Sequence, residues 1–175
     1  GGAHNSGVVF SITSSGKERV LHSFGGAPDG ANPFASLIDV KGTLYGTTWF
    51  GGAYPCGSAG GCGTVFSITP SGKERVLHSF GNGTDGIFPM ASLIKVKGTL
   101  YGTTNHGGAY CSSSGGCGTI FSITPDGTEK VLHSFGAAPD GCCSQAGLTD
   151  VHGTLYGTTF AGGTDGFGTV FALTP

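Results

Sequence analysis

Histidines and aspartates recur at matching places along this chain and are the first residues that could do chemistry. His22, His78 and His133 each stand in a Leu-His-Ser-Phe sequence, and Asp29, Asp85 and Asp140 each precede a glycine. Imidazole nitrogens and carboxylate oxygens are common metal ligands. We expect the histidines on outer strands far from one another, where each makes a repeated packing or hydrogen-bonding contact instead.

The aspartates offer calcium a single carboxylate in each loop, which is a thin ligand set for that ion. An Asp-Gly pair is also what a tight turn requires. We therefore expect turns at these places and no cofactor, with calcium binding as the alternative.

Glutamates open three equivalent segments and would be the acids of a glycoside hydrolase if the chain were one. Glu18, Glu74 and Glu129 each stand beside a lysine or arginine, but no second carboxylate is fixed opposite them, as a glycosidase pair needs. A Gly-x-Ser-x-Gly nucleophile sequence is also absent. The sequence therefore predicts solvated strand ends and no enzyme.

The chain contains six cysteines, and the first four form two Cys-x5-Cys pairs inside glycine-rich connections. They are Cys56, Cys62, Cys111, Cys117, Cys142 and Cys143. The shared spacing of the two pairs predicts two local disulfides and an oxidising compartment, whereas zinc would need four converging ligands. The last two cysteines, which we group with the disulfide cysteines, are adjacent and permit a vicinal bridge, a bond to another chain or two free thiols.

Aromatic residues mark the places where otherwise similar segments differ. Trp49 and Phe50 stand between a Tyr-Gly-Thr-Thr sequence and a pair of glycines, and Tyr54 and Tyr110 stand in the loops that follow. Aromatic rings at loop tips can stack on sugar rings or on another subunit. The alternative is that loops simply vary in sequence.

Composition limits the kind of partner. Charged residues make up 10% of the chain and the net charge is −2, so no basic field is available for a phosphate backbone or an anionic membrane surface. No apolar run approaches the length of about 18 residues that crosses a membrane. We therefore expect neither nucleic-acid binding nor membrane insertion in this segment.

Most of the chain is a tandem repeat with a period of about 50 to 56 residues, a range typical of stacked blades or solenoid coils. Paired glycines set its phase, which predicts one array over residues 1–175 with repeats at 1–50, 51–106, 107–161 and a partial repeat at 162–175. Glycine is abundant, 36 of 175 residues, but it recurs in register, unlike glycine in a disordered linker.

One repeat reads as four short antiparallel strands, at 89–96, 99–104, 118–124 and 129–135. Lys97 and Gly98 are typical of a two-residue type I′ hairpin turn, and Gly102 marks a close approach of a backbone or aromatic ring. No window has helical spacing of apolar residues. The fold class is therefore all-β, with four-stranded blades like those of a β-propeller and no significant helix.

The segments GTLYGTT, GTVFSITPSG and ERVLHSF resemble the tandem repeat of Gloeobacter and Verrucomicrobia, the GloVer repeat of choice-of-anchor proteins. The resemblance implies a secreted or surface-displayed bacterial protein without established catalytic residues. More loosely, the repeat is similar to a kelch blade. That likeness implies inner strands at 35–40, 91–96 and 146–151 and outer strands at 18–24, 74–80 and 129–135.

The number of strands predicts how the blades are used. The segments give two, four, four and three strands, thirteen in all, which is an open or incomplete set of about three blades, whereas closed propellers typically need at least four complete ones. An exposed edge strand is a template for pairing, and head-to-tail contacts that do not close make filaments. We expect either a piece of a longer array or self-association of copies into a filament or surface assembly, with glycan binding as the alternative function.

Overall fold

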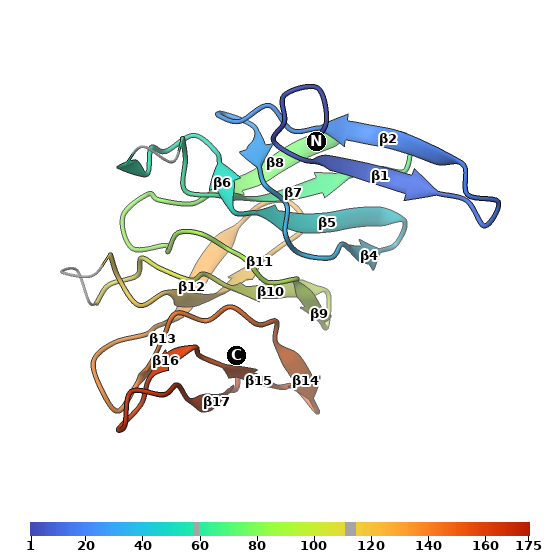
Figure 1. The fold of residues 1–175 in the computed structure, drawn as a ribbon. Coiled ribbons are helices and arrows are strands. Elements are labelled where there is room, and N and C mark those ends of the chain that lie inside the picture. The colour runs from blue at the N-terminus through green and yellow to red at the C-terminus, as the bar shows by residue number, and fades with distance from the viewer. Residues whose placement is uncertain (58–59, 111–114) are drawn as a thin grey trace.

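Successive β-sheets stack in chain order from the N-terminus to the C-terminus in the computed structural model, which describes residues 1–57, 60–110 and 115–175 (Figure 1). The prediction of an all-β chain is confirmed, and no α-helix lies within the described residues. Accordingly, no helix in that part of the chain is long and apolar enough to cross a membrane.

Four antiparallel sheets form the stack, and the inner two have four strands each. The first sheet pairs β1 (Val8–Ile12) with β2 (Glu18–Ser23). The second has the order β4 (Ile38–Val40), β5 (Thr43–Thr48), β7 (Thr64–Ile68) and β8 (Glu74–Ser79). The third has the order β9 (Ile94–Val96), β10 (Thr99–Thr103), β11 (Thr119–Ile123) and β12 (Glu129–Ser134). The fourth has the order β14 (Thr149–Val151), β15 (Thr154–Thr158) and β17 (Val170–Leu173).

Four further strands of two residues each connect neighbouring sheets. β3 (Gly30–Ala31) pairs with β6 (Phe50–Gly51), and β13 (Gly141–Cys142) pairs with β16 (Ala161–Gly162). Each pair joins the loop that leaves one sheet to the end of the second strand of the next. The sequence did not predict them, because a two-residue bridge between glycine-rich loops has no periodic pattern.

The hairpin turns follow the predicted chemistry. Lys97 has φ 49° and Gly98 has φ 94°, which are the two positive values that a type I′ turn requires. The equivalent residues Lys41 and His152 also have positive φ. The first strand of each hairpin is shorter than expected, with three residues, because the residues before it run outside the ladder.

Each second strand has a glycine that lies against a phenylalanine of the third strand. A Cβ atom on Gly102 would lie 2.6 Å from Phe121 Cζ and 2.9 Å from Leu93 Cδ2, too close for any real contact. Gly46 has the same relationship to Phe66 and Leu37. The glycine therefore lets the ring lie flat across the strand, as the sequence predicted.

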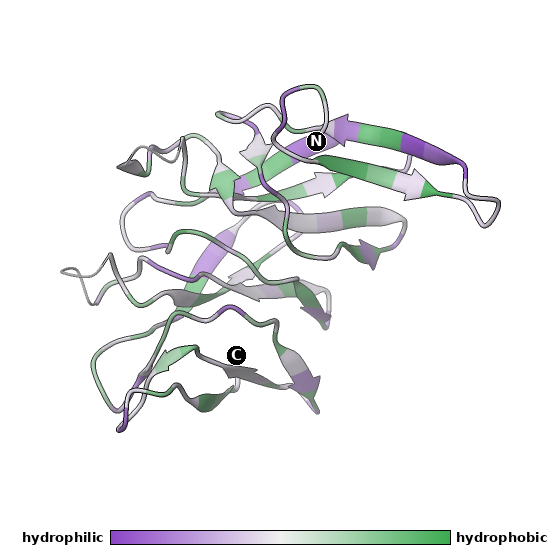
Figure 2. Cartoon of the chain, viewed as in Figure 1, coloured by the Kyte–Doolittle hydropathy of each residue, from purple (hydrophilic) through white to green (hydrophobic). Residues whose placement is uncertain are grey.

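The hydrophobic core lies between the sheets. Figure 2 shows apolar segments in the strands of each sheet; β2, for example, has an apolar middle between polar ends. Three clusters of buried side chains each join two adjacent sheets; one of them contains Val65 and Phe80 from the second sheet with Leu100 and Phe121 from the third. Each inner sheet is therefore stabilised by a sheet on either side, and each end sheet by one neighbour.

Candidate functional site: the junctions between sheets

Every junction between sheets has one edge-to-face pair of phenylalanine rings. The first ring follows the outer strand of one sheet, and the second belongs to the third strand of the next sheet. Phe24 and Phe66 have ring centroids 5.1 Å apart, as do Phe80 and Phe121, while Phe135 and Phe171 are 5.3 Å apart. Aromatic pairs prefer this geometry, which adds about 0.5–1.5 kcal/mol to the burial of their surface.

A histidine and an aspartate hold the first of these rings in place. His78 Nε2 lies 2.8 Å from Asp85 Oδ2, and the Gly81 N–H donates to Asp85 Oδ1 over 3.0 Å. The His78 ring also packs edge-on against Phe80, with centroids 4.7 Å apart. The pairs His22–Asp29 and His133–Asp140 repeat the arrangement at 2.9 and 3.0 Å. The histidines therefore make the repeated contact that the sequence predicts, and their partners are the turn aspartates.

Glutamates from the following sheet approach these pairs. Glu129, at the start of β12, interacts with His78 and Asp85 of the sheet before it, and Glu74 does the same with His22 and Asp29. Burial raises the pKa of Glu129 to about 7; the charge of Asp85 adds to this, while His78 opposes it. The expectation of solvated glutamates is wrong for these two residues, because the neighbouring sheet covers them.

One junction brings three potential metal ligands together. Single ligand atoms of His22, Asp29 and Glu74 all lie within 4.8 Å of one another, the one such group among the described residues. The Asp29 carboxylate already accepts hydrogen bonds from His22 and from the Gly25 and Gly30 N–H groups. These hydrogen bonds hold the loop around Asp29 and do not require a metal ion. The expected absence of a cofactor stays a prediction.

Arginine side chains also cross the junctions. The Arg19 guanidinium donates to the Ser71 carbonyl over 2.9 Å, and the Arg75 guanidinium donates to the Asp126 carbonyl over 2.6 Å. Ser71 and Asp126 lie in the turns between the third and fourth strands of the following sheets. The outer edge of each sheet is thereby fastened to the next.

The same positions are open to solvent at the two ends of the stack. Phe66 and Ile68 of the second sheet are fully buried, but their counterparts Phe10 and Ile12 in β1 are 53% and 63% exposed. At the other end, Val170 of β17 is 80% exposed although its counterpart Val65 is fully buried. The stack therefore ends in two apolar faces whose residues match the two sides of an internal junction.

The aromatic residues predicted as ligand contacts fall into separate groups. Trp49 stacks on Phe50 with ring centroids 4.3 Å apart, and both rings also contact Phe88 from the next repeat. Phe34, which is 62% exposed, packs edge-on against Trp49. The sequence did not predict Phe34 and Phe88 as part of this cluster, because they stand at different places in the repeat: Phe34 follows Pro33, whereas Phe88 precedes Pro89.

The predicted tyrosines lie apart from that cluster. Tyr54 is 38% exposed and Tyr110 is 59% exposed, and they pack beside Gly81 and Gly136 in the loops after the outer strands. Among the described residues, neither tyrosine makes a ring contact with Trp49. The four predicted residues do not form a single site.

One of the predicted disulfides is present, between Cys56 and Cys62, with Cα atoms 5.1 Å apart. For the second predicted pair, Cys117 is buried and Cys111 lies outside the described residues. Cys142 and Cys143 are two thiols with sulfur atoms 2.7 Å apart. Their grouping with the disulfide cysteines is therefore corrected to the alternative of free thiols, and burial raises the pKa of Cys142 to about 12.

Comparison with known proteins gives one result for the whole chain. No curated protein shows significant sequence similarity to it. The model of the Gloeobacter/Verrucomicrobia repeat matches residues 1–175, which include all four sheets and all three junctions described above. The chain therefore belongs to the Gloeobacter/Verrucomicrobia repeat family.

Proposed function

We propose that this chain is a non-enzymatic structural or interaction protein of the bacterial cell surface or exterior, whose copies associate end to end. The observation that carries the proposal is the exposure of Phe10 and Ile12, since their counterparts in the second and third sheets, Phe66 with Ile68 and Phe121 with Ile123, are fully buried. An apolar face with a matching apolar face at the opposite end favours a head-to-tail contact. Such contacts form filaments when they do not close.

The free energy available from burying the exposed side chains favours a weak, reversible association. Burying a phenylalanine or isoleucine side chain stabilises a contact by about 1.5–3 kcal/mol, and association itself costs several kcal/mol. The three side chains Phe10, Ile12 and Val170 alone therefore support a weak contact. The association becomes stronger only if one end face covers the whole of the other, as neighbouring sheets cover each other inside the stack.

Two further features support the proposal, one for a location outside the cytosol and one for a role without catalysis. The Cys56–Cys62 disulfide is typical of proteins in oxidising compartments outside the cytosol. The histidine–aspartate pairs recur, one at each junction, and each histidine has an aspartate partner seven residues later. An active site usually departs from such symmetry, whereas a structural contact repeats with it.

The test is a concentration series of the chain in sedimentation velocity and native mass spectrometry. We expect the mass to rise with concentration, and we expect Phe10→Asp and Val170→Asp each to give monomers. An equimolar mixture of these two variants should give a dimer and nothing larger, because each retains one intact end. Phe167→Asp is the control, since Phe167 is 93% exposed in a loop. A wild-type chain that stays monomeric at every concentration refutes end-to-end association.

Glycan binding is the second candidate, because Phe34 and Trp49 present an aromatic edge with solvent access. A glycan array is the screen for a sugar. Binding that is lost in Phe34→Ala, with the thermal stability unchanged, supports this function, and an array without hits removes it.

A further inference from the structure

β1 has an open hydrogen-bonding edge. In the other three sheets, the third strand (β7, β11 or β17) pairs with the second strand (β5, β10 or β15) of the same sheet. β1 is the equivalent third strand, but among the described residues it pairs with β2 alone. An unpaired strand edge is a template for another strand.

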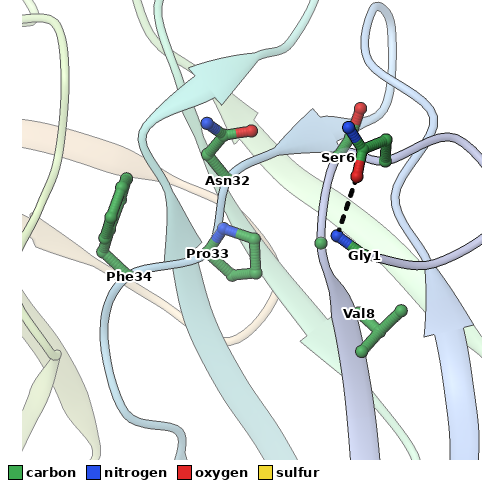
Figure 3. A pocket seen from close by; sticks show the side chains of 8 residues that line it. Gly1, Ser6, Val8, Asn32, Pro33 and Phe34 are labelled. Carbon is green, nitrogen blue, oxygen red and sulfur yellow. Dashed lines mark hydrogen bonds between the residues drawn. The ribbon is translucent and has the colours of Figure 1, made fainter.

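A groove of about 450 Å³ runs beside this edge. Its lining residues are Val8, Val9, Phe10, Pro33, Ala35, Ser36, Leu37 and Phe66. A second hollow of about 280 Å³ adjoins it and shares Val8 and Pro33; Figure 3 shows Pro33 between Phe34 and Val8. The groove is largely apolar and extends from β1 to the residues that precede β4.

The backbone beside β1 leaves room for a strand. At Gly118, just before β11, an added Cβ atom would lie 3.0 Å from the Asn105 carbonyl oxygen, because the end of the second strand passes there. The equivalent residue Gly63 is equally close to the Trp49 carbonyl, at 2.8 Å. At Gly7, the nearest atoms all belong to Pro33. The place that the second strand fills in other sheets is therefore unfilled next to β1.

The floor of the groove shows the same difference. Leu93 and Leu148 are 4% and 8% exposed, and Leu93 shares its cluster with Val40 and Tyr45 from the hairpin of the sheet before. Their counterpart Leu37 is 36% exposed. A hairpin placed in the groove would cover Leu37 as β4 and β5 cover Leu93.

One hydrogen bond defines how such a hairpin would sit. The Thr47 hydroxyl of β5 donates to the Ala91 carbonyl of the next repeat over 3.1 Å, and Thr103 makes the equivalent bond to Ala146. The counterpart acceptor in the groove is the Ala35 carbonyl. Among the described residues, no hydrogen bond to this carbonyl is found.

We propose that the groove beside β1 binds a strand-turn-strand hairpin of the chain's own repeat type. Its Gly-Thr-Leu-Tyr-Gly-Thr strand pairs antiparallel with β1, with the second glycine opposite Phe10, as Gly46 is opposite Phe66 in the second sheet. The next threonine donates to the Ala35 carbonyl. This is recognition by strand addition, in which main-chain bonds give affinity and side-chain pockets give specificity.

The occupant is a hairpin without a third strand of its own. The hairpins β4–β5, β9–β10 and β14–β15 of a folded copy already pair with β7, β11 and β17, so a second folded copy does not supply one. The inference deepens the proposed interaction role but uses the edge of β1, whereas end-to-end association uses the faces.

The test uses the whole chain and a labelled synthetic peptide of residues 91–105, ASLIKVKGTLYGTTN, followed by fluorescence anisotropy. We expect saturable binding, and at least tenfold weaker binding of the Gly102→Val peptide, because its side chain would overlap the Phe10 ring. The Phe10→Ala chain should regain binding of the valine peptide, since it removes that ring. A scrambled peptide of the same composition is the control.

Three outcomes overturn the inference: no saturable binding of the native peptide, equal binding of the scrambled peptide, or no discrimination between glycine and valine. Phe10 is more than half exposed, so Phe10→Ala is expected to fold, and circular dichroism checks this. Peptide binding without a rise in mass in the concentration series contradicts only end-to-end association. A rise in mass without peptide binding contradicts only the hairpin site.

Discussion

Phe80 and Phe121 meet edge to face across a junction between two sheets, with ring centroids 5.1 Å apart and both side chains fully buried. Phe80 directly follows the outer strand β8, and Phe121 belongs to β11, the third strand of the next sheet. The same pair recurs at each of the three junctions, so each junction contains an equivalent aromatic contact.

Truncating a junction ring should cost far more than truncating its counterpart at the end of the stack. We expect Phe121→Ala to lower the free energy of unfolding by about 3–5 kcal/mol, since it leaves a cavity in a closed core. Phe10→Ala should cost less than about 1 kcal/mol, because that ring is 53% exposed. Urea denaturation followed by circular dichroism measures both, and equal losses would contradict the assignment of the two faces.

The buried glutamate makes stability depend on pH in a defined direction. The pKa of Glu129 is raised from 4.5 to about 7 in the folded chain, chiefly by burial. The folded chain therefore binds more protons than the unfolded chain between these values, and the contribution of Glu129 to stability falls as pH rises from about 4.5 to 7. We expect Glu129→Gln to be more stable than wild type at pH 8 and similar to it at pH 4.

Thermal melts across pH 4–8 test this difference. Glu18→Gln is the matched control, because Glu18 opens the equivalent strand of the first sheet and is exposed. Its profile should run parallel to that of the wild type. A Glu129→Gln profile that also runs parallel would show that burial does not hold a proton on this carboxyl group.

Each aspartate that anchors the loop after an outer strand should contribute to the free energy of unfolding, and a more buried aspartate should contribute more. Asp85→Ala removes the acceptor of His78 and of the Gly81 N–H, and we expect a loss of about 2 kcal/mol. The Asp85 side chain is 9% exposed and that of Asp140 is 34% exposed, so Asp140→Ala should cost about half as much. Chemical denaturation of the two variants side by side provides the comparison.

Removing the disulfide should weaken the chain without unfolding it. The Cys56–Cys62 bond closes a loop of about seven residues, which the chain-entropy model equates with about 2 kcal/mol. We expect the double variant Cys56→Ser and Cys62→Ser to lose about this much stability and to keep its β-sheet spectrum. Loss of the spectrum would mean that the bond is required for the fold itself.

Local chemistry allowed the sequence to determine the fold class and the strands. A type I′ turn needs two positive φ values, so Lys97 before Gly98 identifies a hairpin from two residues. Alternation within the strands and the glycine at 102 identify the blade in the same way. These features depend on neighbours in the sequence, so they recur with each repeat and can be predicted from the sequence.

Only the tertiary structure decided which residues of different repeats meet. Glu129 lies beside His78 and Asp85, about 50 residues earlier, because one sheet stacks on another; no local pattern distinguishes it from the exposed Glu18. An alignment of Val8–Ile12 with Thr64–Ile68 would have singled out Phe10, but not its exposure. The sequence by itself determined the repeated unit and its strands, because turns and alternation are local, and stacking decided which faces, edges and carboxyl groups are covered, because burial is a property of neighbours in space.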